Sequence, residues 1–137
     1  MTTLELNKAR DLKQEARRKA GQIEKLRGAL KGIVPERDGQ PRGNVLTSKI
    51  EELTIKIIDL DNELEELETA LSAAQLEIAS AISAAETTDE EFNVLYLRYV
   101  FCNNFLDIQY KLDMSDARCF YLHRQGLKKL KAKFNLK

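Results

Sequence analysis

The sequence predicts an all-α protein: an N-terminal antiparallel helical hairpin of coiled-coil type over residues 1–86, then a small helix-turn-helix module of three helices over residues 87–137. Three observations lead to this fold class. Apolar residues recur at steps of three and four through residues 50–81. Both prolines of the chain, Pro35 and Pro41, separate that segment from a similar one before it. After residue 86 the apolar period restarts three times, each time behind residues that favour helix caps.

The acidic middle of the chain predicts one long helix. Its apolar positions are Ile50, Leu53, Ile57, Leu60, Leu64, Leu67, Leu71, Ala74, Ile78 and Ala81. Such a repeat over more than four heptads is typical of a coiled coil. Neither Gly nor Pro occurs from Thr47 to Glu86, so a continuous helix of about 40 residues and about 60 Å is expected. Thr47 or Ser48 is expected to cap its start.

The first segment carries a weaker version of the same repeat. Its apolar positions are Ala9, Leu12, Ala16, Ile23, Leu26, Leu30 and Ile33, and Lys19 occupies the position that lacks an apolar residue. A Pro/Gly loop over residues 34–46 follows, so neither helix continues through it. We therefore expect two helices that fold back on one another.

Charge is segregated along the chain in a way that favours this pairing. Residues 1–46 hold 11 Lys+Arg against 6 Asp+Glu, residues 47–91 hold 2 against 13, and residues 92–137 hold 9 against 3. The basic first helix and the acidic second helix attract each other, although a surface ion pair contributes only about 0 to 1 kcal/mol. Because two helices bury few residues, we expect the hairpin to form a homo-oligomer or to pack on the C-terminal part.

The C-terminal part predicts three short helices. Thr88 and Glu91 fit a capping box, and an apolar face follows at Phe92, Leu95, Tyr96, Tyr99 and Val100. This helix should stop near Cys102. Asn104 is expected to cap a second helix that carries Phe105, Ile108 and Leu112 on one face. Residues 113–115 break that helix, and Ser115 is the expected cap of a final helix that runs toward Phe134.

The final helix separates into an apolar side and a basic side. The apolar side consists of Cys119, Leu122, Gly126, Leu127, Leu130 and Phe134, with His123 at its edge. The other side carries Ala117, Tyr121, Arg124 and Lys128, flanked by Arg118 and Gln125. From residue 118 to residue 137 there are seven basic residues and no acidic one. Such a face suits DNA, but on charge alone a solvated or protein-docking face is an equally good interpretation.

The residues before the final helix favour DNA. A helix-turn-helix needs apolar anchors around a turn residue, and this chain supplies them at Ile108, Leu112, Asp113 (the turn), Met114, Cys119 and Leu122. Base edges are then expected to be read by Ala117, Arg118, Tyr121, Arg124 and the neighbouring Gln125. Phosphates are expected to be bound by Lys128, Lys129 and Lys131, with Ser115 capping the helix beside a phosphate.

The stretch VLYLRYVFCNNFLDIQYKLDMSDARCFYLHRQGLKKLK, residues 94–131, resembles the fourth conserved region of bacterial sigma factors and, more closely, phage regulators of the RinA/ArpU-like type. The segment PRGNVLTSKIEELTIKIIDLDNELEEL is similar to the helical hairpin of those regulators. The resemblance implies a transcriptional regulator of late or packaging genes of a phage or prophage, which binds double-stranded DNA and contacts RNA polymerase. The chain departs from the family at Gln109, where a small Ala is preferred, and at Asp113, where Gly is preferred.

Other functional classes lack the residues they need. Cys102 and Cys119 stand seventeen apart and His123 is the one histidine, so no zinc site, disulfide framework or other cofactor is expected. No Gly-rich phosphate loop, nucleophile elbow or acid/base pair is present, which argues against an enzyme. No apolar run approaches the roughly 20 residues that span a membrane, and no signal peptide is evident. The expected location is the cytoplasm of a bacterial host cell.

Two alternatives remain at this point. The acidic helix would suit a coiled-coil adaptor, or an inhibitor of host machinery that mimics DNA. A phage DNA-packaging recognition subunit would also combine a helix-turn-helix with a helical oligomerisation element.

Overall fold

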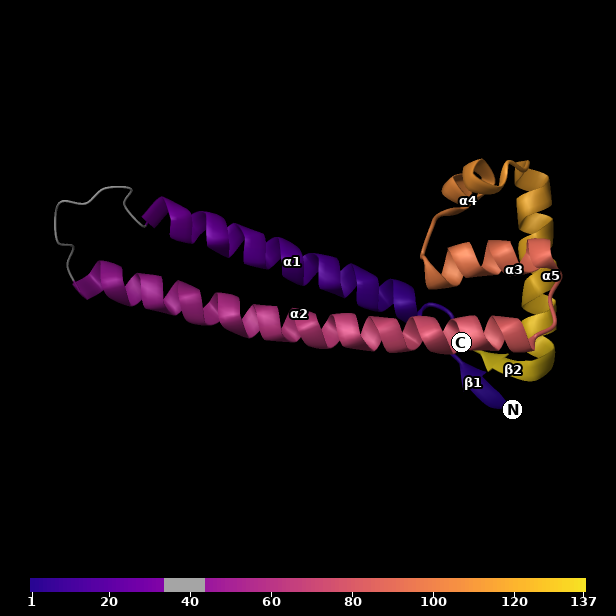
Figure 1. Cartoon of the computed structure of the whole chain (residues 1–137), viewed down its shortest axis with the longest axis horizontal. Coiled ribbons are helices and arrows are strands. Elements are labelled where there is room, and N and C mark those ends of the chain that lie inside the picture. The colour runs from indigo at the N-terminus through magenta and orange to yellow at the C-terminus, as the bar shows by residue number, and fades with distance from the viewer. Residues whose placement is uncertain (34–43) are drawn as a thin grey trace. The chain divides into compact units, whose positions relative to one another are not determined.

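The computed structural model describes residues 1–33 and 44–137 and has an all-α fold, as predicted (Figure 1). In chain order the elements are β1 (Thr2–Leu4), α1 (Lys8–Ile33), α2 (Asn44–Ala84), α3 (Asp89–Leu95), the π-helix η1 (Tyr96–Val100), α4 (Phe105–Leu112), α5 (Asp116–Lys133) and β2 (Phe134–Leu136). Within the described ranges, no helix combines the length and the apolar character that crossing a membrane would require.

The chain forms two compact units, which differ from the predicted division at residues 86 and 87. One unit comprises Met1–Leu12 and Ala70–Lys137, and the other comprises Lys13–Thr69. The end of α2 therefore belongs with the C-terminal helices. The predicted Pro/Gly loop falls mainly on residues 34–43, which lie outside the described residues. α2 begins at Asn44, ahead of the predicted caps at Thr47 and Ser48.

In the unit Lys13–Thr69, α1 and α2 run antiparallel (Figure 1). Among the described residues of this unit, Ile23 and Ile57 are the buried ones, and both belong to the predicted apolar positions. Lys19 stands where the repeat of α1 lacks an apolar residue, and its Nζ lies 2.6 Å from Glu63 Oε2. A second ion pair joins Arg27 to Asp61 at 3.1 Å. The attraction expected between the basic and acidic segments thus acts through long charged side chains beside a narrow apolar seam.

The core of the other unit gathers around the end of α2. Ala74, Ile78, Ala81 and Ile82 are buried there together with residues of the C-terminal helices. The remaining buried members of this cluster are Leu4, Leu6, Ala9, Ala85, Leu95, Val100 and Leu130. Every predicted heptad position of α2 from Ala74 to Ala81 is therefore buried, because the heptad repeat continues into this core.

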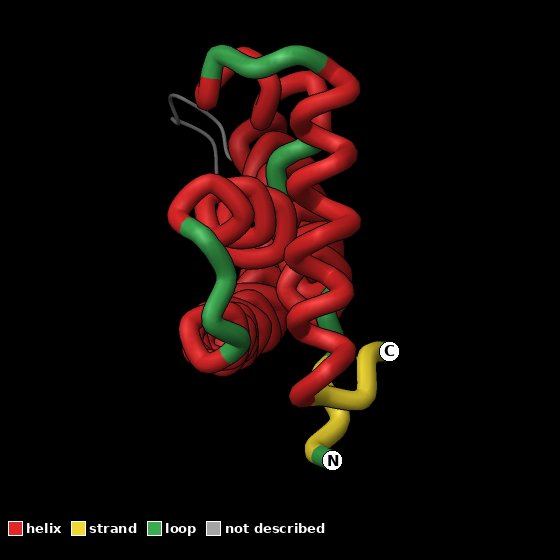
Figure 2. Tube along the Cα trace, turned by 90° about the vertical axis from the view of Figure 1, so that its right-hand side faces the viewer, coloured by secondary structure: helices red, strands yellow, loops and turns green. Residues whose placement is uncertain are grey.

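Two short strands complete this unit and were not predicted. β1 and β2 pair in parallel with Thr2 opposite Phe134, and Lys137 N donates to Leu4 O at 3.0 Å (Figure 2). Three-residue strands show too little alternation to be recognised from sequence. The final helix, expected to run toward Phe134, ends at Lys133, and Phe134 begins β2.

The crossing of α3 and α5 depends on Gly126. A Cβ at this position would lie 2.7 Å from Leu95 Cδ1 and 3.0 Å from Leu95 Cγ. Leu95 is fully buried in the core, so its side chain can give way only by moving against its packed neighbours. The absence of a side chain at residue 126 thus sets how closely the two helices approach.

We expect Gly126→Ala to lower the free energy of unfolding by about 1 to 2 kcal/mol, because overpacking against Leu95 outweighs the helix propensity gained. Urea unfolding followed by circular dichroism measures this change. Gly28→Ala is the matched control, since nothing lies within 4 Å of a Cβ there. That control should gain up to about 1 kcal/mol. A gain of the same size in both variants would contradict the tight crossing.

Candidate nucleic-acid interface

The predicted capping box holds the start of α3. Glu91 N donates to Thr88 Oγ1 at 3.2 Å, and Thr88 N donates to Glu91 Oε1 at 2.9 Å. The helix then widens into η1, where Phe101 N donates to Tyr96 O at 3.2 Å. Gln75 Nε2 donates to Val100 O at 3.0 Å and so satisfies a carbonyl at the end of η1. The widened turn was not predicted, and it places the aromatic residues that follow.

α4 and α5 are joined by a tight turn whose caps agree with the prediction. Asn104 Oδ1 accepts from Asp107 N at 2.8 Å, and Ser115 Oγ accepts from Arg118 N at 3.2 Å. Asp113 ends α4 in the left-handed conformation, with φ 51° and ψ 57°. Asp adopts this conformation more readily than most residues. Asp113 can therefore end α4 at the position where the resembled family prefers Gly.

The contact between α4 and α5 is apolar. Val94, Ile108, Cys119 and Leu122 are buried in one cluster. The partly buried residues around it are Leu97, Phe105, Leu112 and Met114. All five predicted apolar anchors belong to this cluster, and burial raises the pKa of the Cys119 thiol, as expected of an inert core cysteine.

Gln109, the other departure from the resembled family, is half-buried on α4. It lines an open groove of about 510 Å³ together with Leu106, Asp107, Tyr110 and Met114. Its backbone carbonyl accepts from Met114 N at 3.0 Å. Gln109 thus contributes to the turn through its backbone while its side chain lies beside a surface groove.

His123, placed by the sequence at the edge of the apolar side of the final helix, belongs to an aromatic network. Tyr99 Oη lies 2.7 Å from His123 Nε2, and the Phe105 ring meets the imidazole edge-on with 5.0 Å between centroids. Arg98 lies 4.4 Å from the centre of the Phe105 ring and donates to Asn103 O at 3.1 Å. Burial first, and then the charges of Arg98 and Arg124, lower the pKa of His123, so the imidazole is neutral at pH 7.

The predicted DNA-binding residues of α5 divide into two groups. Ala117, Tyr121, Arg124, Lys128 and Lys131 are exposed on the side opposite the core, Gln125 beside them is half-buried, and Ser115 is exposed at the cap. Arg118 and Lys129 instead form ion pairs with the start of α3. Arg118 Nη2 lies 2.9 Å from Glu90 Oε1, and Lys129 Nζ donates to Glu91 Oε1.

The pair of Lys129 and Glu91 is the buried one. Glu91 is 5 % exposed, whereas Glu90 and Arg118 are each about half exposed. Burial raises the pKa of Glu91, but the hydrogen bonds from Lys129 and from Thr88 outweigh burial, and the net pKa lies below the ordinary value of 4.5. Lys129, expected to bind phosphate, therefore has a structural contact that its sequence position did not reveal.

Comparison of the chain with known protein families, with curated proteins and with solved structures finds no match. Across the described residues, His, Cys, Asp and Glu side chains do not form a group of three or more that could hold a metal ion. The interpretation of this surface therefore depends on its own geometry.

We expect Lys129→Ala to lower the free energy of unfolding by about 1 to 2 kcal/mol, because it leaves the Glu91 carboxylate buried with only the cap hydrogen bond. Lys131→Ala removes an exposed lysine from the same helix and should change stability by less than about 0.5 kcal/mol. Urea unfolding of the two variants makes the comparison. Equal, small effects would show that the ion pair is not structural.

We expect the free energy of unfolding to decrease in two separate ranges as the pH is lowered. The first begins as pH drops below the ordinary His pKa of 6.5, because the unfolded chain takes up a proton before His123 does in the folded state. The chain has one histidine, so His123→Gln should flatten this window. The second begins below 4.5, where protonation of Glu91 removes the stability its ionised form contributes. Urea unfolding between pH 3 and pH 8 follows both, and an unchanged upper window in the variant would contradict the assignment.

Proposed function

We propose that the protein is a sequence-specific DNA-binding transcriptional regulator, in which α4, the turn and α5 act as a helix-turn-helix. One observation carries the proposal: α5 buries one side in the core and exposes Ala117, Tyr121, Arg124 and Lys128 on the other, directly after a capped, left-handed turn. A helix presented in this way has the form that enters a major groove.

The roles follow from position along α5. Ala117, Arg118 and Tyr121 lie in its first two turns, where a recognition helix contacts base edges, and Arg124 and Gln125 follow. Lys128 and Lys131 lie further along and are suited to phosphates, whereas Lys129 has Glu91 as its partner. Ser115 and the first amides of α5 can receive a phosphate at the helix N-terminus, although Asp116 in the first turn opposes this.

The contact of Arg118 with Glu90 bears directly on base reading. An exposed ion pair of this kind contributes little to stability. It holds the guanidinium beside Glu90 at the start of α3, and DNA must compete with Glu90 for it. Arg118 therefore fits a base-reading role better than a purely electrostatic one, since an Arg already paired with a carboxylate adds little net positive charge to the surface.

The resemblance to RinA/ArpU-like regulators adds the biological setting to the proposal. It supports control of phage or prophage late genes in the cytoplasm of a bacterial host, with RNA polymerase as a second partner. The exposed side of α5 suits DNA whatever that setting is.

A binding experiment tests the proposal. Fragments selected from a phage genomic library supply a specific duplex, which is then compared with a scrambled one by fluorescence anisotropy across a salt series. Arg118→Ala should reduce discrimination between the two duplexes by about 1 to 3 kcal/mol. Lys128→Ala should weaken both equally and reduce the salt slope by about one. Equal losses of specific and random binding in both variants would contradict these roles.

A second candidate function is supported by the acidic surface of α2. Glu51, Glu52, Asp59, Glu65, Glu66 and Glu68 are all exposed. Such a surface would suit an adaptor that binds a basic partner, or an inhibitor that imitates DNA. Failure of the wild-type chain to bind any duplex at low salt would reject the DNA-binding proposal and leave this one.

A further inference from the structure

Arg118 lies on a flank of α5. Winding the helix at about 100° per residue groups four exposed residues within about 60° of one another, namely Ala117, Tyr121, Arg124 and Lys128. Arg118 lies about 90° to one side of this group, and Lys129, eleven residues further on, lies on the same flank. A long side chain on this flank can reach either the exposed side of α5 or the helix that packs beside it.

The guanidinium of Arg118 lies against α3. Its Nη2 is 2.9 Å from Glu90 Oε1, and Lys129 on the same flank contacts Glu91, the next residue of α3. The start of α3 therefore lies along the flank that carries both cations. While the pair with Glu90 is formed, the charge of Arg118 is held at α3 and not over the side of α5 that we propose enters a groove.

Both partners of this pair stand on a fixed backbone. Ser115 Oγ accepts from Arg118 N at 3.2 Å, which fixes the first turn of α5. Glu91, beside Glu90, is 5 % exposed and is held by the capping box and by Lys129. Forming the pair therefore orders only the two side chains, so it costs less conformational entropy than a pair between mobile segments.

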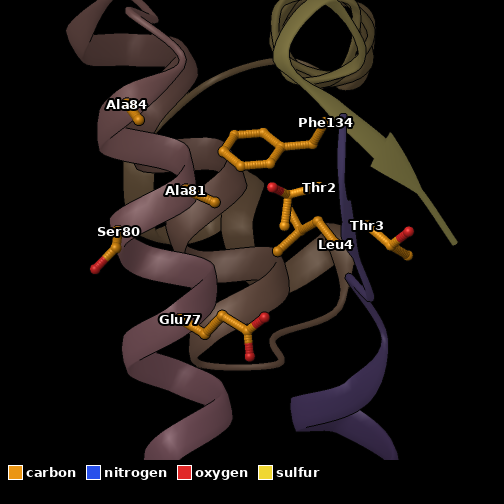
Figure 3. A pocket seen from close by; sticks show the side chains of 8 residues that line it. All are labelled: Thr2, Thr3, Leu4, Glu77, Ser80, Ala81, Ala84 and Phe134. Carbon is orange, nitrogen blue, oxygen red and sulfur yellow. The ribbon is translucent and has the colours of Figure 1, made fainter.

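The far end of α5 is tied to α2. Lys133 Nζ donates to Ala84 O at 2.7 Å. The next residue, Phe134, faces Ala81 and Ala84 of α2 across an apolar cavity of about 330 Å³ (Figure 3). Because α5 is held at both ends, separating Arg118 from α3 requires a movement of side chains and not of the helix.

We infer, on the basis of the proposed DNA binding, that Glu90 competes with DNA for Arg118 and so limits the affinity of α5 for every duplex. The cost of breaking the pair is the same whichever duplex displaces it. Glu90 therefore lowers specific and random binding by similar factors, and discrimination is left to the base contacts. Glu90 is a positioning residue, because it acts on DNA through Arg118.

Side-chain NMR of arginine tests the contact in the absence of DNA. Rotation of the Arg118 guanidinium about its Nε–Cζ bond should be slower in the wild type than in Glu90→Gln, and the signal is assigned by its loss in Arg118→Ala. Asp89→Asn is the matched control, because it removes one negative charge from the same exposed turn of α3. This control should leave the rotation unchanged. Equal rotation in the wild type and in Glu90→Gln would overturn the inference.

Fluorescence anisotropy with the selected and the scrambled duplex tests the competition. Glu90→Gln should raise both association constants by about two- to fivefold at low salt, the factor that an exposed ion pair represents. The salt slope should become steeper by about one, because one more cation is available to phosphates. The ratio of the two constants should change by less than about twofold, since the pair is broken in both complexes. Asp89→Asn should have a smaller effect on both constants.

The same substitution in an Arg118→Ala chain separates the contact from general charge. There, Glu90→Gln should do no more than Asp89→Asn does. An unchanged affinity in the single variant, or a rise that persists without Arg118, would overturn the inference and leave the proposed function standing. Failure of both the wild type and Glu90→Gln to bind any duplex at low salt would reject the proposed function, and the inference with it.

Discussion

The close crossing of α3 and α5 is the constraint on which the C-terminal part of the structure depends. Gly126 permits the approach, Leu95 fills the contact, and Lys129 reaches the buried Glu91 one turn further along α5. Glu91 is also half of the capping box at the start of α3, so one carboxylate both caps a helix and joins it to another. The orientation of α5, and with it the direction of its exposed side, follows from these contacts rather than from the short α4.

The same crossing reduces the net positive charge on the helix that we propose binds DNA. Two of the seven basic residues after residue 117, Arg118 and Lys129, are paired with acids at the start of α3. The acids are there because negative side chains stabilise the N-terminus of a helix, and α3 has three of them in its first turn. The acids that stabilise the start of α3 therefore also lower the net positive charge of α5. With two of its bases already paired, α5 is better suited to recognise a duplex by shape and hydrogen bonds than by charge alone.

The sequence predicted most of the local and periodic features, although it misplaced the start of α2 and the end of α5. The heptad positions of α2, the caps at Thr88, Asn104 and Ser115, and the apolar side of α5 were all predicted, because each is encoded within a few residues. The π-helix, the paired strands and the partners of Arg118 and Lys129 were not, because they depend on residues far apart in the chain. Lys129 shows the difference best: its neighbours identify a basic helix, but only the fold brings Glu91 to it.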